Sequence, residues 1–373
     1  MIKRKAGFSF IELLIVIVLI GFVLAAVSNS FVGLLRSYKQ QSKIAETNIE
    51  GIIGLEMLRR DLESAGYGLP WVVGTAYNEA ANATAAVYND SPGAPRAVLC
   101  GDNVVPGTLG IVNGSDYLVL KAANLATNDA CAKWSYLLSD GTTTNWNTSG
   151  KENFIPAGTE RVIVLSPGTN INNSRKLIIN GGNYFTTKGN TAVFADAGET
   201  RIIYGVDDPG ANPLRMPFNR ADYYVTITGA TIPGRCAQGT GTLVKAIVNQ
   251  NGGLFNGNIF PLLDCVADMQ VVTFLDTAGT GPPYTQSDGL GGVNAASALI
   301  VRDQLKVIQV YILAHEGQRD TSYNHIYPGN LFHVGPGVVG SVGGRDFDLT
   351  AIANYQNYRW KLYTLIVRPN NLR

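Results

Sequence analysis

The chain opens with a short basic segment followed by a long apolar run. Lys3, Arg4 and Lys5 precede a stretch from Phe8 to Leu35 in which Glu12 is the one charged residue. An apolar run of this length can span a bilayer as a helix. The flanking basic residues place Met1 in the cytoplasm and the rest of the chain on the other side of the membrane. The pattern therefore predicts a single membrane span with an exported C-terminal region.

A helical period continues beyond the apolar run, from Arg36 to Ala65, with charged residues between the apolar ones. The apolar positions expected to form one face are Leu55, Leu58, Leu62 and Ala65, joined by Ile44, Ile52 and Ile53. This face is expected to pack on a globular domain, and Gly51 and Gly54 are either weak points or sites of close packing. Gly66, Gly68 and Pro70 are expected to end the helix.

After Pro70 the pattern changes to short β-type runs between clusters of Gly, Asn, Asp and Pro. Lys306–Leu313 and Trp360–Val367 are the clearest strands. The predicted fold class is α+β: a long helix over 8–66 packed on a large antiparallel β-rich domain over 67–373. Residues 8–35 of that helix are predicted to be transmembrane and 36–66 amphipathic.

The four cysteines favour disulfides in an oxidising compartment, because no CxxC pair indicates zinc or redox chemistry. Four cysteines allow three connectivities, and buried free thiols are the alternative. The shortest loops favour pairing Cys100 with Cys131 and Cys236 with Cys265.

Net charge and motifs argue against nucleic-acid binding and catalysis. The formal charge is +1, and removing Lys3, Arg4 and Lys5 gives 1 − 3 = −2, so no basic surface for nucleic acid is expected. His315 begins an incomplete HExxH motif, with Arg319 at the second ligand position, and 335–340 matches GxGxxG only formally. Asp207, Asp208 and Asp288 lack the calcium-loop spacing. We expect no enzyme activity, metal or cofactor.

Glu12 distinguishes the apolar run from an ordinary signal peptide cut near Ser28, an ordinary signal anchor or a buried core helix. An acidic side chain at mid-bilayer costs about 2.5 to 3.5 kcal/mol on insertion scales, which indicates a functional partner. Residues 5–16, KAGFSFIELLIV, resemble the class III signal of type IV pilins and pseudopilins. The resemblance implies that prepilin peptidase removes the leader 1–7 after Gly7. It also implies that Phe8 becomes an N-methylated terminus and that Glu12 pairs with its own or a neighbouring subunit's α-ammonium group.

Two later regions resemble PilW-like minor pilins: 58–67, LRRDLESAGY, and the segments 263–270, 305–310 and 363–371. Pro369 departs from the family pattern, and about 70–260 has no counterpart, which suggests an insertion.

The resemblance implies a minor pilin that primes pilus assembly or sits at the tip. Its expected partners are the inner-membrane assembly platform, other minor pilins, the major pilin and a large tip adhesin. The protein would first lie in the inner membrane with its C-terminal domain in the periplasm, and after assembly it would be part of an extracellular pilus. The alternatives are a J-like pseudopilin of type II secretion and an exported enzyme or binding domain on the same anchor.

Overall fold

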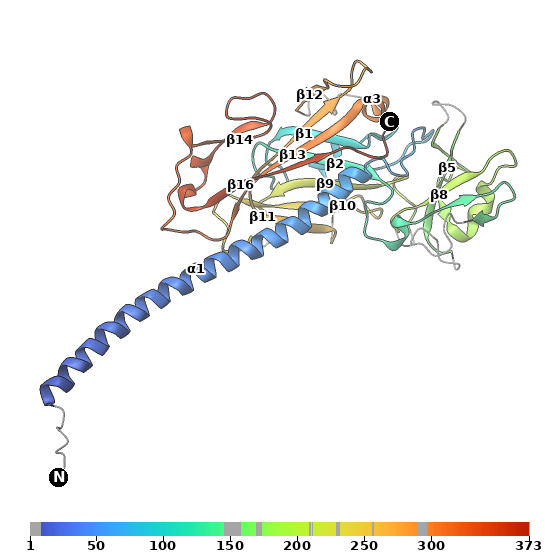
Figure 1. Cartoon of the computed structure of the whole chain (residues 1–373). Helices are drawn as coiled ribbons and strands as arrows, with labels where there is room; N and C mark the ends of the chain where they lie inside the picture. The colour runs from blue at the N-terminus through green and yellow to red at the C-terminus, as the bar shows by residue number, and fades with distance from the viewer. Residues whose placement is uncertain are drawn as a thin grey trace, which may run out of the picture.

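The computed structural model describes residues 9–144, 158–168, 174–208, 210, 212–228, 232–255, 257–288 and 297–372. Helix α1 (Phe10–Ser64) has 55 residues, or about 80 Å at 1.5 Å per residue. Its N-terminal half projects away from the domain (Figure 1). The membrane-span segment Phe10–Ala45 is apolar and unburied, so the buried-core-helix alternative is wrong. The predicted long helix is confirmed.

The main sheet is antiparallel and takes the order β1-β2-β9-β10-β11-β13-β16, with β12 paired to β11. Its strands are β1 (Val98–Val104), β2 (Ser115–Ala122), β9 (Asn219–Thr226), β10 (Gly241–Val248), β11 (Ile259–Leu275), β12 (Thr285–Ser287), β13 (Leu305–Glu316) and β16 (Arg359–Val367). The long strand β11 pairs with β10 through its first part and with β13 through its second. The α+β class with an antiparallel β-rich domain is therefore confirmed.

A smaller antiparallel sheet forms a separate lobe beside the main one (Figure 1). Its strands are β3 (Trp134–Leu137), β4 (Thr143–Thr144), β5 (Arg161–Ser166), β6 (Lys176–Leu177), β7 (Thr186–Thr187) and β8 (Arg201–Gly205). In sequence it lies between β2 and β9, which are neighbours in the main sheet. Most of the predicted 70–260 segment therefore splits between the two sheets, and its origin as an insertion stays a prediction.

The remaining elements are short. Within the described residues they are a hairpin of β14 (Leu331–Val334) and β15 (Arg345–Asp348), the α-helices α2 (Ala83–Ala86) and α3 (Ala298–Gln304), and the 3-10 helices η1 (Asp129–Ala132), η2 (Lys188–Phe194), η3 (Pro328–Asn330), η4 (Leu349–Ala351) and η5 (Tyr355–Asn357). The formal GxGxxG segment is part of the connection between β14 and β15, a loop rather than a strand-to-helix turn.

The C-terminal part of α1 packs directly on the main sheet. Leu55, Leu58 and Leu62 are buried there. A Cβ at Gly54 would lie 1.9 Å from the carbonyl oxygen of Leu262 on β11, so the helix and strand backbones touch. Gly54 is thus a site of close packing, one of the two roles predicted for it.

Candidate functional site

The candidate site is the membrane end of α1, where Glu12 lies in the first helical turn. The backbone N–H of Ser9 donates to Glu12 Oε2 at 2.8 Å, which satisfies one of the unpaired N–H groups at the helix start. The carboxylate also lies at the positive end of the helix dipole. Gly7 and Phe8 lie outside the described residues. Their predicted cleavage and methylation therefore stay predictions.

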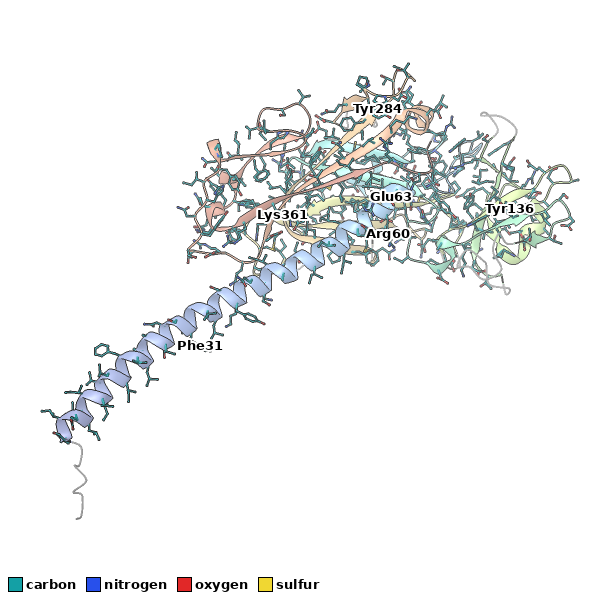
Figure 2. The ribbon with its side chains drawn as sticks, in the orientation of Figure 1. Phe31, Arg60, Glu63, Tyr136, Tyr284 and Lys361 are labelled. Carbon is teal, nitrogen blue, oxygen red and sulfur yellow. A yellow bond between two sulfur atoms is a disulfide. The ribbon has the colours of Figure 1, made fainter. Side chains whose placement is uncertain are left out.

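Nothing in the described part of the chain covers this end of the helix. Phe10 is 80% exposed and Phe31 60% exposed, and Figure 2 shows Phe31 projecting from α1 with no neighbouring element. Within the described residues, the Glu12 carboxylate accepts a hydrogen bond from the Ser9 N–H. A carboxylate can accept further hydrogen bonds. Glu12 can therefore accept hydrogen bonds from an ammonium group that lies outside this part of the chain.

A second exposed surface continues along α1 beyond the membrane-span segment. Ile49, Ile52, Ile53 and Met57, here called the outer stripe, recur at helical spacing and are 43% to 64% exposed. The sequence interpretation that Ile52 and Ile53 join the buried face is wrong, because their side chains are 64% and 61% exposed. Ile49 and Met57 were missed, although their spacing from Ile53 at i−4 and i+4 would have revealed them.

One of the two predicted disulfides forms. Cys236 and Cys265 are bonded, whereas Cys100 and Cys131 are buried free thiols, so the prediction of a 100–131 bond is wrong. Cys100 lies opposite Leu118 on β2, while Cys131 accepts a hydrogen bond from Asn219, which pairs with Ala122 at the other end of that strand. The sheet holds the two thiols apart, and burial raises the pKa of each.

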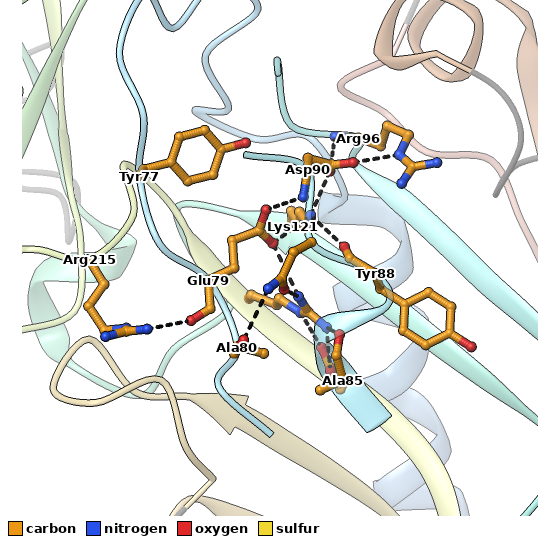
Figure 3. Close-up of polar contacts among 12 residues, drawn as sticks. Tyr77, Glu79, Ala80, Ala85, Tyr88, Asp90, Arg96, Lys121 and Arg215 are labelled. Carbon is orange, nitrogen blue, oxygen red and sulfur yellow. Dashed lines mark hydrogen bonds and ion pairs between the residues drawn. The ribbon is translucent and has the colours of Figure 1, made fainter. Parts of the chain in front are cut away.

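A cluster of buried charges on the main sheet has a structural role. Lys121 on β2 contacts Glu79 and Asp90 at 2.6 Å each (Figure 3). Arg220 on β9 contacts Glu79 at 3.1 Å and Asp222 at 2.7 Å. With Arg96 bound to Asp90, three cations balance three carboxylates. Because each charge is paired and most are fully buried, the cluster fastens the 77–97 segment to the sheet.

The histidines and loop aspartates do not assemble a metal site. Among the described residues, no three His, Cys, Asp or Glu side chains gather to hold an ion. His315 Nε2 accepts a hydrogen bond from the Ala237 N–H at 2.9 Å, and burial lowers the pKa of His315 to about 4. The imidazole is therefore neutral and packed against Tyr358 and Trp360.

Comparison with known proteins bears on the N-terminal segment. Residues 2–28 match the family model for the prokaryotic N-terminal methylation motif. No curated protein and no solved structure matches the chain. The motif implies processing by a prepilin peptidase and assembly with pilus machinery. Together with the exposed apolar helix, it supports a membrane-anchored, single-pass protein of the type IV pilin or pseudopilin type.

Proposed function

We propose that this protein is a minor pilin of a type IV pilus that primes assembly or sits at the tip. The main support for the proposal is that an exposed apolar helix lies apart from the folded domain. The helix, with Glu12 in its first turn, lies at one end of the molecule, and the large domain lies at the other (Figure 1). Such a helix suits burial among the helices of other subunits, where an ion pair at Glu12 would fix the register of docking.

The breadth of the domain favours a low-copy position over the fibre shaft. The main sheet and the small-sheet lobe together extend well to the side of the axis of α1 (Figure 1). Subunits repeated closely along a shaft must fit their domains side by side, whereas a tip subunit has free space above it. This argument supports the tip or priming role, with an adhesin and other minor pilins as the proposed neighbours.

Replacement of Glu12 tests the proposal. In a strain lacking the native copy, Glu12→Leu should insert and be cleaved normally, because it removes a polar group that is costly in lipid. Docking should be weakened, because the partner ammonium loses its counter-charge in a desolvated bundle. The measurement compares cleaved protein in membranes with protein in sheared fibres.

Asp129→Asn is the control. Asp129 lies on the folded domain rather than on α1, and its side chain is 92% exposed and pairs with Lys133, so its loss should leave incorporation unchanged. Normal incorporation of Glu12→Leu would refute the docking role. Wild-type protein that stays in the cell envelope, together with a secretion defect on deletion, would favour the type II secretion pseudopilin instead.

A further inference from the structure

A cavity of about 230 Å³ lies beside the point where α1 ends, and segments distant in sequence enclose it. Its walls are mostly apolar, and Arg302 on α3 is the one charged residue among the described residues that line it. The residues that matter here are Leu69, Trp71, Pro95, Leu299, Arg302 and Leu372. An almost wholly apolar cavity with one cation favours a ligand that has both an apolar body and an anionic group.

Arg302 is held firmly but leaves hydrogen-bond donors open. Its side chain is 9% exposed, and Nε donates to Asp303 Oδ1 at 2.9 Å. The guanidinium carbon lies 4.3 Å from the ring centroid of Trp71. Within the described residues, its two Nη nitrogens donate to no acceptor. A buried guanidinium with an open pair of N–H groups is a good receptor for a carboxylate, which it can bind through two parallel hydrogen bonds.

A second guanidinium group lies near Arg302, because Arg175 is 4.6 Å from the same Trp71 ring. An adjoining hollow shares Ala94, Ala298 and Leu299 with the cavity and adds Asp90 and Arg96. Asp90 is already paired with Lys121 and Arg96. Arg302 is therefore the cation that we expect to receive an anionic group.

We propose that this groove binds an extended peptide segment of a partner polypeptide, with a carboxylate on Arg302 and a neighbouring apolar side chain in the cavity. The two adjoining hollows form an elongated site, which suits an extended chain. An acidic sugar fits less well, because the described residues that line the cavity are apolar apart from Arg302 and the indole of Trp71, which are too few to satisfy its hydroxyl groups. The groove lies by α3 and the C-terminus, at the opposite end of α1 from Glu12 (Figure 1), and does not depend on the proposed pilus function.

Calorimetric titration of the full chain in detergent micelles tests this proposal. The probes are acetyl-Leu-Glu-Leu-amide and acetyl-Leu-Gln-Leu-amide, which have nearly the same shape and differ in charge. The Glu peptide should bind about tenfold or more tightly than the Gln peptide, as expected for a desolvated charge-assisted pair. Arg302→Gln should abolish that preference, whereas Arg60→Gln, at a highly exposed site on α1, should preserve it.

A second variant keeps the test decisive if Arg302→Gln does not fold. Ala298→Trp fills the groove without removing the charge and should abolish binding of the Glu peptide. Equal binding of the two peptides, no saturable binding of the Glu peptide, or wild-type binding by folded Ala298→Trp would each overturn the proposal. Arg302-dependent binding of glucuronate that is tighter than that of the Glu peptide would overturn the assignment to a polypeptide.

Discussion

His315 shows how burial fixes the chemistry of a single residue. The imidazole accepts the Ala237 N–H beside the Cys236–Cys265 disulfide. Burial lowers its pKa from an ordinary 6.5 to about 4. The folded pKa lies below the unfolded one, so the unfolded chain binds more protons on acidification. The stabilising contribution of His315 is present above about pH 6.5 and is lost as the pH falls towards 4.

We predict that His315→Leu flattens this pH dependence. Between about pH 7 and about pH 5, wild type should lose about 2 kcal/mol of unfolding free energy relative to the variant. Burial raises the pKa of Asp268 to about 6, which favours the folded state at lower pH. This contribution is the same in wild type and variant, so it cancels in the comparison. Urea unfolding at the two pH values measures the difference. His325→Leu, at an exposed position, should keep the wild-type slope, and an unchanged slope in His315→Leu would contradict the prediction.

Local sequence patterns predicted only some of the important residues. Glu12 stands out because a charge in an apolar run is conspicuous without any knowledge of the fold. Lys121 and Arg220 did not stand out, since charged residues within strands usually face solvent. Their burial depends on Glu79, which the chain brings to them from a distant segment. Trp71 and Arg302 likewise meet only after folding.

At the scale of elements, α1 and the last strands were predictable because their patterns are continuous. The clear runs at 306–313 and 360–367 fall within β13 and β16. The pairing of β2 with β9 was not predictable, since the small sheet lies between them in sequence. Loop length also predicted the bond between Cys236 and Cys265 but failed for Cys100 and Cys131, because strand positions rather than loop entropy separate those thiols.

The contact between α1 and β11 gives a prediction for Gly54. Gly54→Ala places a methyl group 1.9 Å from the Leu262 carbonyl oxygen, so helix and strand must separate. Overpacking of this kind costs about 1 to 3 kcal/mol, which exceeds the gain of about 1 kcal/mol in helix propensity. Thermal unfolding of the full chain in detergent should show a lower midpoint. Gly33→Ala, with nothing within 4 Å, should not lower it, and equal midpoints for the two variants would refute close packing.

At the scale of the whole molecule, α1 offers apolar surface well beyond the length needed for a bilayer. The outer stripe of Ile49, Ile52, Ile53 and Met57 lies past the membrane-span segment Phe10–Ala45. Exposed apolar residues that gather on one helix face indicate a protein contact. From the proposed function, we expect the outer stripe to contact the helices of neighbouring subunits.

Ile52→Lys tests that assignment. The side chain is 64% exposed, so the unfolding free energy should change by less than about 0.5 kcal/mol. The amount of protein in sheared fibres should fall, because a charge would be desolvated at the contact. Val87→Lys, a similar change at a residue 75% exposed away from α1, should leave incorporation unchanged. Equal incorporation of both variants would contradict the assignment.

We predict that α1 is a processed pilin-type helix and that the mature chain begins at Phe8. Mass spectrometry of the N-terminal peptide of the mature protein, purified from membranes, measures this directly. The motif over 2–28 predicts cleavage between Gly7 and Phe8 and a methyl group on the Phe8 amine. A terminus at Ser28 or an intact Met1 would refute processing as a pilin-type helix.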